Sequence, residues 1–168
     1  MGRLADSSLG ARYLGQNPWV LVASPAYLAQ HAAPKTPTDV AKHPCLIYSS
    51  VQGDERWHFT STLGRRKPGG PNAGTDEAIP VRGPLRTNNL SVVLEATLAG
   101  MGLAILPWYV AHASVRDGHV TPLLTDFALP VQEMHAVFPS PKLVPSKVSS
   151  FIGFLQESLG DAWWERAS

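Results

Sequence analysis

Three uncharged polar residues, Thr87, Asn88 and Asn89, stand directly before an apolar run in the segment TNNLSVVLEATLAGMGLAILPWY. Residues of these types cap helices, because their side-chain oxygens accept hydrogen bonds from backbone N–H groups of the first turn. The same N–H groups and the helix dipole attract anions. The segment therefore predicts either a cap alone, for which Asn88 or Thr87 is the natural residue, or a cap that also contacts a bound ligand.

The elements that must position these residues are indicated by short apolar runs that alternate with helix-start signals. Runs such as PWVLVAS and CLIYS are typical of strands buried on both faces of a sheet. Ser24 and Pro25 follow the first run, where serine can cap a helix and proline fits its first position. The alternation predicts an α/β domain with a mixed sheet of about five strands. The predicted sheet strands include residues 18–24, 45–49, 103–106 and 133–138, and further strands are predicted at 56–60 and 81–86.

The run that follows Asn89 has helical periodicity and is closed by Gly100 and Gly102. Thr97 interrupts its apolar face, but a threonine hydroxyl can bond to the carbonyl four residues earlier without ending the helix. Pro107 starts another predicted helix, and residues 36–39 (TPTD) carry a capping signal in which Asp39 reaches back. A final amphipathic helix is predicted from Val148, Phe151, Ile152, Leu155 and Leu159, closed by Gly160.

Composition excludes several classes of protein. The chain has 168 residues, of which 44% are hydrophobic and 16% charged, as is ordinary for a globular protein. Its formal net charge of +1 gives no electrostatic case for nucleic-acid binding by this segment. No apolar run is long enough to span a membrane. The single cysteine, Cys45, and a start without a signal-peptide core predict a cytoplasmic protein.

Motifs for catalysis or cofactor binding are not found in the sequence. The six histidines lack metal-ligand spacing, and one cysteine cannot form a thiolate zinc site. The motifs G-x-S-x-G and S-x-x-K are absent. We therefore predict no catalytic residue, metal or cofactor. Trp19 and Trp57 are interpreted as core residues, and Arg65–Lys67 as a solvated loop or, less favourably, an anion contact.

The order of several segments resembles the effector-binding region of LysR-type transcriptional regulators. The best markers are VASPAYL, the following TPTDV and AGMGLAILP, and the similarity runs from about Gly2 to Leu159. The resemblance implies a fold like that of periplasmic solute-binding proteins, with two α/β lobes and a cleft. It also implies that the winged helix-turn-helix of such regulators lies outside this chain, so that this segment itself does not bind DNA.

The resemblance further implies how the chain is divided. We expect mainly the second lobe, together with crossover segments and the closing helix of the first lobe. The expected segments are a first-lobe remnant and crossover at 1–18, the second lobe at 19–136, a return crossover and closing helix at 137–160, and a tail at 161–168.

In such a fold the ligand lies at strand ends and helix starts. The resemblance therefore implies that Thr87–Asn89, with Ser24 and Pro25 nearby and Leu106 and Pro107 as an apolar wall, line the second-lobe side of a cleft for a small, anionic effector. It also implies a homo-oligomer, with a dimer expected. A solute-binding protein of the same fold is the alternative, and an enzyme on a related α/β scaffold is a more distant one.

Overall fold

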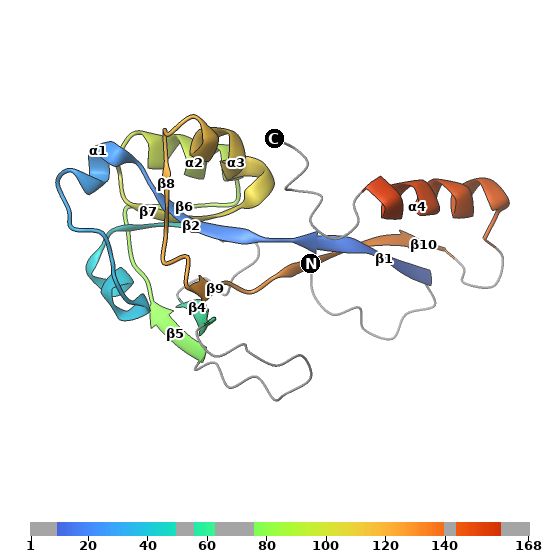
Figure 1. The fold of residues 1–168 in the computed structure, drawn as a ribbon, viewed down its shortest axis with the longest axis horizontal. Helices are drawn as coiled ribbons and strands as arrows, with labels where there is room; N and C mark the ends of the chain where they lie inside the picture. Colours follow the sequence, from blue (N-terminus) through green and yellow to red (C-terminus); the bar gives the residue numbers. More distant parts are fainter. Residues whose placement is uncertain (1–9, 50–55, 63–75, 140–143, 159–168) are drawn as a thin grey trace. The chain divides into compact units, whose positions relative to one another are not determined.

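The computed structural model describes residues 10–49, 56–62, 76–139 and 144–158 (Figure 1). The chain divides into two compact units, one of residues 18–130 and one that joins residues 1–17 to residues 131–168. No helix in the described ranges has the length and apolarity needed to span a bilayer. The assignment of these units to the expected lobe and crossover segments stays a prediction.

A mixed five-stranded sheet forms the centre of the 18–130 unit, in the strand order β6-β3-β7-β2-β8. Its strands are β6 (Leu85–Thr87), β3 (Cys45–Tyr48), β7 (Leu103–Pro107), β2 (Trp19–Ala23) and β8 (Thr121–Leu123). Strands β6, β3 and β7 run parallel, whereas β2 is antiparallel to β7 and to β8. The predicted α/β class and mixed sheet are therefore confirmed.

Alternate residues of these strands enter two different clusters, one on each face of the sheet. Leu46 and Leu106 pack with Val93 of α2 (Leu90–Leu98) and with residues of α3 (Trp108–Arg116). Figure 1 shows both helices on one side of the sheet. Thr97 is fully buried on this side, and its Oγ1 donates to the Val93 carbonyl at 2.7 Å, as the sequence predicted. Each fully buried leucine on this face contributes about 2 kcal/mol through burial.

The opposite face of the sheet packs against a three-stranded antiparallel sheet. Ile47 and Ile105 join Trp57, Phe59 and Ile79 in this second cluster, which confirms Trp57 as a core residue. The sheet order is β5-β4-β9, formed by β5 (Asp76–Pro80), β4 (Arg56–Ser61) and β9 (Phe127–Ala128).

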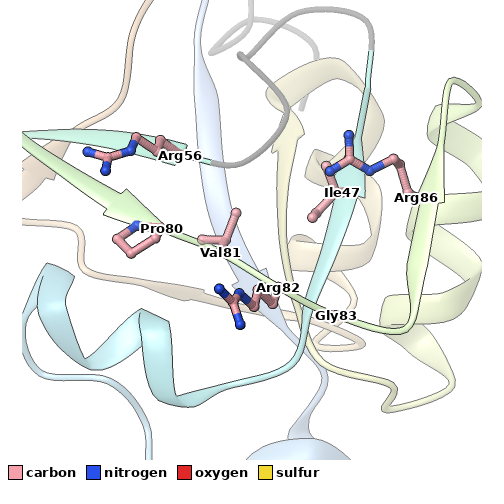
Figure 2. Close-up of a pocket in the computed structure, with 7 residues that line it drawn as sticks. All are labelled: Ile47, Arg56, Pro80, Val81, Arg82, Gly83 and Arg86. Atoms are coloured by element: carbon pink, nitrogen blue, oxygen red, sulfur yellow. The ribbon is translucent and has the colours of Figure 1, made fainter.

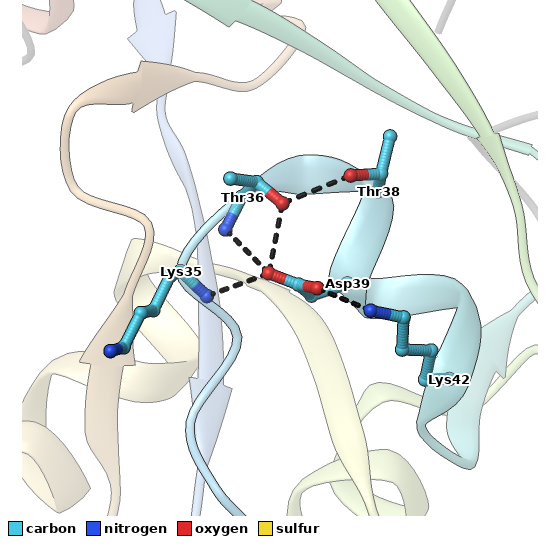
Figure 3. Close-up of polar contacts among 5 residues, drawn as sticks. All are labelled: Lys35, Thr36, Thr38, Asp39 and Lys42. Atoms are coloured by element: carbon cyan, nitrogen blue, oxygen red, sulfur yellow. Dashed lines mark hydrogen bonds and ion pairs between the residues drawn. The ribbon is translucent and has the colours of Figure 1, made fainter.

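A 3-10 helix, η1 (Pro37–Lys42), precedes β3 and contacts β5. The Asp39 carboxylate accepts from the backbone N–H of Thr36 at 3.0 Å and from that of Lys35 at 3.2 Å, and it pairs with Lys42 at 2.7 Å (Figure 3). The predicted helix start at residues 36–39 is therefore correct, with Asp39 reaching back as expected.

Three strand predictions are corrected. Residues 133–138 lie in β10 (Gln132–Phe138), which pairs with β1 (Gly10–Asn17) in the other unit and is not part of the central sheet. Of residues 81–86, only the last two enter β6. Strand β5 lies where no strand was predicted. A strand's own residues indicate its conformation, but its partner depends on contacts far along the chain.

The second unit contains the β1–β10 ribbon and α4 (Ser146–Ser158). Gln156 donates from Nε2 to the Tyr13 carbonyl at 2.8 Å, and Ile152 is the residue of α4 that is buried. Phe151 and Phe154 are 60% and 62% exposed. The predicted final helix is confirmed within the described residues, while Leu159 and Gly160 lie outside them.

Candidate functional site

The carboxyl ends of three parallel strands lie at one edge of the central sheet. Tyr48 and Thr87 are paired at the ends of β3 and β6, and the Ser49 N–H donates to the Thr87 carbonyl at 2.9 Å. Because β7 runs parallel to β3, its carboxyl end lies at the same edge. We call the edge formed by Tyr48, Ser49 and residues 87–89 the open edge. Ligands of α/β sheets characteristically bind at such strand ends.

Helix α2 starts at the open edge, and Asn89 is its cap. Asn89 Oδ1 accepts from the N–H groups of Ser91 at 2.9 Å and Val92 at 3.4 Å. The prediction that Asn88 or Thr87 caps the helix is wrong, because β6 holds Thr87 in a strand and the helical turn begins only at Leu90.

Thr87 stabilises the segment just before the first turn of α2. Its Oγ1 accepts from the Asn89 N–H at 3.2 Å, which orders the link between β6 and α2. The side chain of Asn88 is exposed between them and forms no hydrogen bond with a described residue. Of the three predicted polar residues, Asn88 is thus the one whose side chain forms no hydrogen bond with a described residue.

Ser24 and Pro25 lie at the other end of the sheet, which corrects the prediction that they lie near Asn89. Strand β2 is antiparallel to β7, with Trp19 opposite Pro107, so the chain leaves β2 at the edge away from the open one. Pro25 begins the short helix α1 (Pro25–Leu28), and Ser24 caps it by accepting from the Tyr27 N–H at 3.3 Å, as predicted. Ser24 is only 2% exposed, so its hydroxyl is not accessible to a ligand.

Ser24 lies beside the turn that follows α2. Gly100 follows α2 with φ of 77°, and a Cβ there would contact Ser24 Oγ at 3.6 Å. The N–H of Leu103 donates to the Pro44 carbonyl at 2.9 Å. We call the edge that contains Ser24, Cys45, Gly100 and Gly102 the packed edge. Burial of Cys45 at this edge raises the pKa of its thiol to about 12, so the thiol stays protonated and unreactive at neutral pH.

Leu106 and Pro107 do lie at the carboxyl end of β7, but both side chains are fully buried. Leu106 packs in the cluster beneath α2 and α3. Pro107 precedes α3, as its predicted role at a helix start requires. Leu106 and Pro107 therefore present no exposed apolar side chain in the described unit, because the strand that ends here is covered on both faces.

An aromatic pair at the open edge was not predicted from the sequence. The ring of Tyr48 lies 6.1 Å from that of Trp19, and Tyr48 is half-buried whereas Trp19 belongs to the core. The sequence places Tyr48 at the end of an apolar run, and nothing in that run indicates that its ring is partly exposed. The Arg65–Lys67 prediction lies outside the described residues.

The open edge offers hydrogen-bonding groups, and residues 87–89 carry no carboxylate, imidazole or amine. Its amides, hydroxyls and helix N–H groups suit reversible binding of a polar or anionic molecule. Within the described ranges, no group of three or more histidine, cysteine or acidic side chains is arranged to hold a metal ion.

Comparison with known proteins identifies the family. The model of the LysR substrate binding domain matches residues 1–160. The chain belongs to the LysR substrate-binding domain family. It is 33% identical to the HTH-type transcriptional regulator DmlR of Escherichia coli over 150 residues, which cover 89% of this chain and 45% of DmlR. The LysR-family chain thus spans about half the length of the curated relatives it matches.

Solved structures of LysR-type regulators share the fold. The full-length virulence activator AphB of Vibrio cholerae matches with a TM-score of 0.75 and 25% identity, covering 92% of this chain and 49% of AphB. CrgA of Neisseria meningitidis matches with a TM-score of 0.72 and 26% identity, covering 95% and 50% of the two chains. The fold is therefore of the periplasmic-binding-protein type, as the resemblance implied.

Proposed function

We propose that this chain is the effector-sensing regulatory domain of a LysR-type transcription factor. The family match and the regulators among its relatives support this function. In this proposal the domain binds a small anionic molecule and changes the conformation of a DNA-bound oligomer in the cytoplasm. DNA contact belongs to a helix-turn-helix outside this segment, and the domain does not catalyse a reaction.

One observation supports the position of the effector site. Helix α2 begins where the parallel strands β3 and β6 end, so its first N–H groups and the exposed Asn88 amide lie at the open edge. A helix N-terminus carries a partial positive charge that favours an anionic ligand. The site we propose consists of Thr87, Asn88 and Asn89, without Ser24 and Pro25 at the packed edge and without the buried side chains of Leu106 and Pro107.

Exposure of Asn88 makes it the residue for a direct test. The test uses a full-length regulator that contains this segment, with malonate, succinate and malate as probes in titration calorimetry. If Asn88 contacts the probe, Asn88→Ala should weaken binding about tenfold, which corresponds to one hydrogen bond of about 1.4 kcal/mol. Gln30→Ala is the matched control, because Gln30 is an exposed amide beyond α1 at the packed edge.

Two outcomes would count against this site. One is unchanged affinity in Asn88→Ala while the parent protein binds a probe. The other is an equal loss in Asn88→Ala and Gln30→Ala, which would indicate a general effect of removing surface amides. A mobility-shift assay with promoter DNA would show separately whether the full-length protein binds DNA, and a failure there would argue against the regulatory function itself.

We also infer that the domain self-associates as a dimer. The exposed rings of Phe151 and Phe154 on α4 support this, because adjacent exposed aromatic side chains are usually covered by a partner. Light scattering of the 168-residue chain at high micromolar concentration should report a dimer, and the double substitution of both residues by serine should shift it toward monomer. A monomeric parent chain would contradict the inference.

A further inference from the structure

A pocket of about 480 Å³ lies in the 18–130 unit, on the face of the central sheet that packs against β4 and β5. It is lined by Ile47, Arg56, Pro80, Val81, Arg82, Gly83 and Arg86 (Figure 2). Three of these seven residues are arginine and none is acidic. We call this site the arginine pocket.

The backbone around the arginine pocket is fixed by pairing with neighbouring strands. Arg86 lies opposite Ile47 in the β3–β6 pair, and Arg56 lies opposite Pro80 in the β4–β5 pair. The Arg82 carbonyl accepts from the Cys45 N–H at 2.8 Å. The three arginines therefore come from different segments that the fold brings to one pocket.

Gly83 allows the closest of these approaches. A Cβ at this position would overlap the Cys45 carbonyl oxygen, so any other residue would push the segment that carries Arg82 away from β3. Val81 is 3% exposed and anchors the same segment in the core. The backbone of Arg82 is thus held by the buried Val81 side chain on one side and by the close approach of Gly83 to Cys45 on the other.

The charges of the pocket favour a ligand with several anionic groups. Figure 2 shows the three guanidinium groups apart from one another, around Val81 and Ile47. Arg56 and Arg82 form no ion pair with an acidic side chain among the described residues. Like charges in one pocket repel each other, and guanidinium groups pair in a bidentate manner with carboxylates and phosphates. A single small ion carries one anionic centre, whereas a short molecule with separated anionic groups can pair with more than one arginine.

We propose that the arginine pocket binds a small organic polyanion that carries at least two carboxylate or phosphate groups. Its anionic groups pair with Arg56 and Arg82, and its carbon frame lies over the exposed ring of Pro80. This site is separate from the proposed effector site. Arg86 and Thr87 are consecutive in a strand and point to opposite faces of the sheet.

The experiment measures binding of citrate and of pyrophosphate to the 168-residue chain by calorimetry, against sodium chloride at matched ionic strength. The variants are Arg56→Gln and Arg82→Gln. The control is Arg116→Gln, which removes the same charge from the end of α3, where Arg116 pairs with Asp117 at 3.0 Å. We expect saturable binding that weakens about tenfold or more in each pocket variant and less than about twofold in the control. Tighter binding of one probe identifies the carboxylate or the phosphate as the preferred group.

Three results would overturn the proposal: no saturable binding of either probe, equal weakening in the Arg116→Gln control, or unchanged binding in both pocket variants. Asn88→Ala separates this site from the proposed effector site, since binding lost in Asn88→Ala and kept in the pocket variants would place the polyanion at the open edge. A further measurement compares the affinity of the parent chain and the pocket variants for a duplex oligonucleotide. If the pocket variants lose affinity for the duplex while citrate binding is unchanged, the arginines contact DNA and the proposal is wrong.

Discussion

Helices α1 and α2 start at the two opposite edges of the central sheet, and each has a polar side chain as its cap. The two caps differ in their exposure to solvent. At the packed edge, Ser24 caps α1 and is 2% exposed. At the open edge, Asn89 caps α2 and is exposed beside Asn88. Both caps satisfy N–H groups of a first turn. Only at the open edge can a ligand reach the polar side chains beside the cap, so the cap chemistry shows where a helix begins but not where a site lies.

The largest expected effect comes from disturbing the packed edge at Gly102. This residue has φ of 153°, and a Cβ there would overlap the Pro44 carbonyl oxygen next to the Leu103–Pro44 hydrogen bond. Gly102→Ala should lower the free energy of unfolding by about 3 kcal/mol, because the strain and the overlap cannot both be relieved. Urea denaturation of the parent chain and the variant measures the difference.

Gly118→Ala is the control for backbone strain alone. Gly118 has φ of 73°, but a Cβ there would have no atom within 4 Å. It should lower the free energy of unfolding by only about 1 kcal/mol. Equal losses in the two variants would show that close packing at Gly102 is not what distinguishes the packed edge.

The next effect is a direct comparison of the two caps. Ser24→Ala and Asn89→Ala should each lower the free energy of unfolding by about 1 kcal/mol, because each leaves first-turn N–H groups without their acceptor. Thermal or urea unfolding would measure both. The variants should differ in ligand binding, since only Asn89 lies at the open edge. If Ser24→Ala weakens probe binding as much as Asn89→Ala does, the distinction between the edges is wrong.

The sequence was informative where local chemistry decides the structure. The capping role of Ser24, the reach of Asp39 and the back-bonding of Thr97 all depend on residues within four positions, and each was predicted. The direction of β2 relative to β7 depends on pairing between residues more than eighty positions apart. Because that direction could not be predicted from the sequence, Ser24 was expected to lie near Asn89.

Local sequence patterns also could not predict which side chains are buried or which distant side chains line one pocket. Leu106 and Pro107 occur at the correct strand end, but whether their side chains are covered depends on α2, α3 and β2. Likewise, Arg56 and Arg86 are thirty positions apart and meet at one pocket only because β4 and β6 pack near β3. Neither arginine stands in a motif that predicts this.

The smallest expected effect is a pH dependence that arises at the packed edge. The Tyr27 hydroxyl lies 2.7 Å from His43 Nδ1, just before β3 begins. Burial, with a smaller contribution from the charge of His31, lowers the pKa of His43 below its ordinary value. The unfolded chain therefore binds more protons than the folded chain as pH falls below about 6.5, and folding becomes less favourable.

Urea midpoints at pH 7.5 and pH 5.5, for the parent chain and for His43→Gln, would test this dependence. The parent chain should lose stability at the lower pH, and His43→Gln should lose less, because glutamine keeps a partner for Tyr27 without titrating. Asp39 does not interfere in this range. Its pair with Lys42, followed by its bonds to Thr36, holds its pKa well below the usual range, so its contribution is lost only below about pH 4. If the parent chain and His43→Gln lose the same stability between pH 7.5 and pH 5.5, the pH dependence does not arise at His43. It then does not distinguish the two edges.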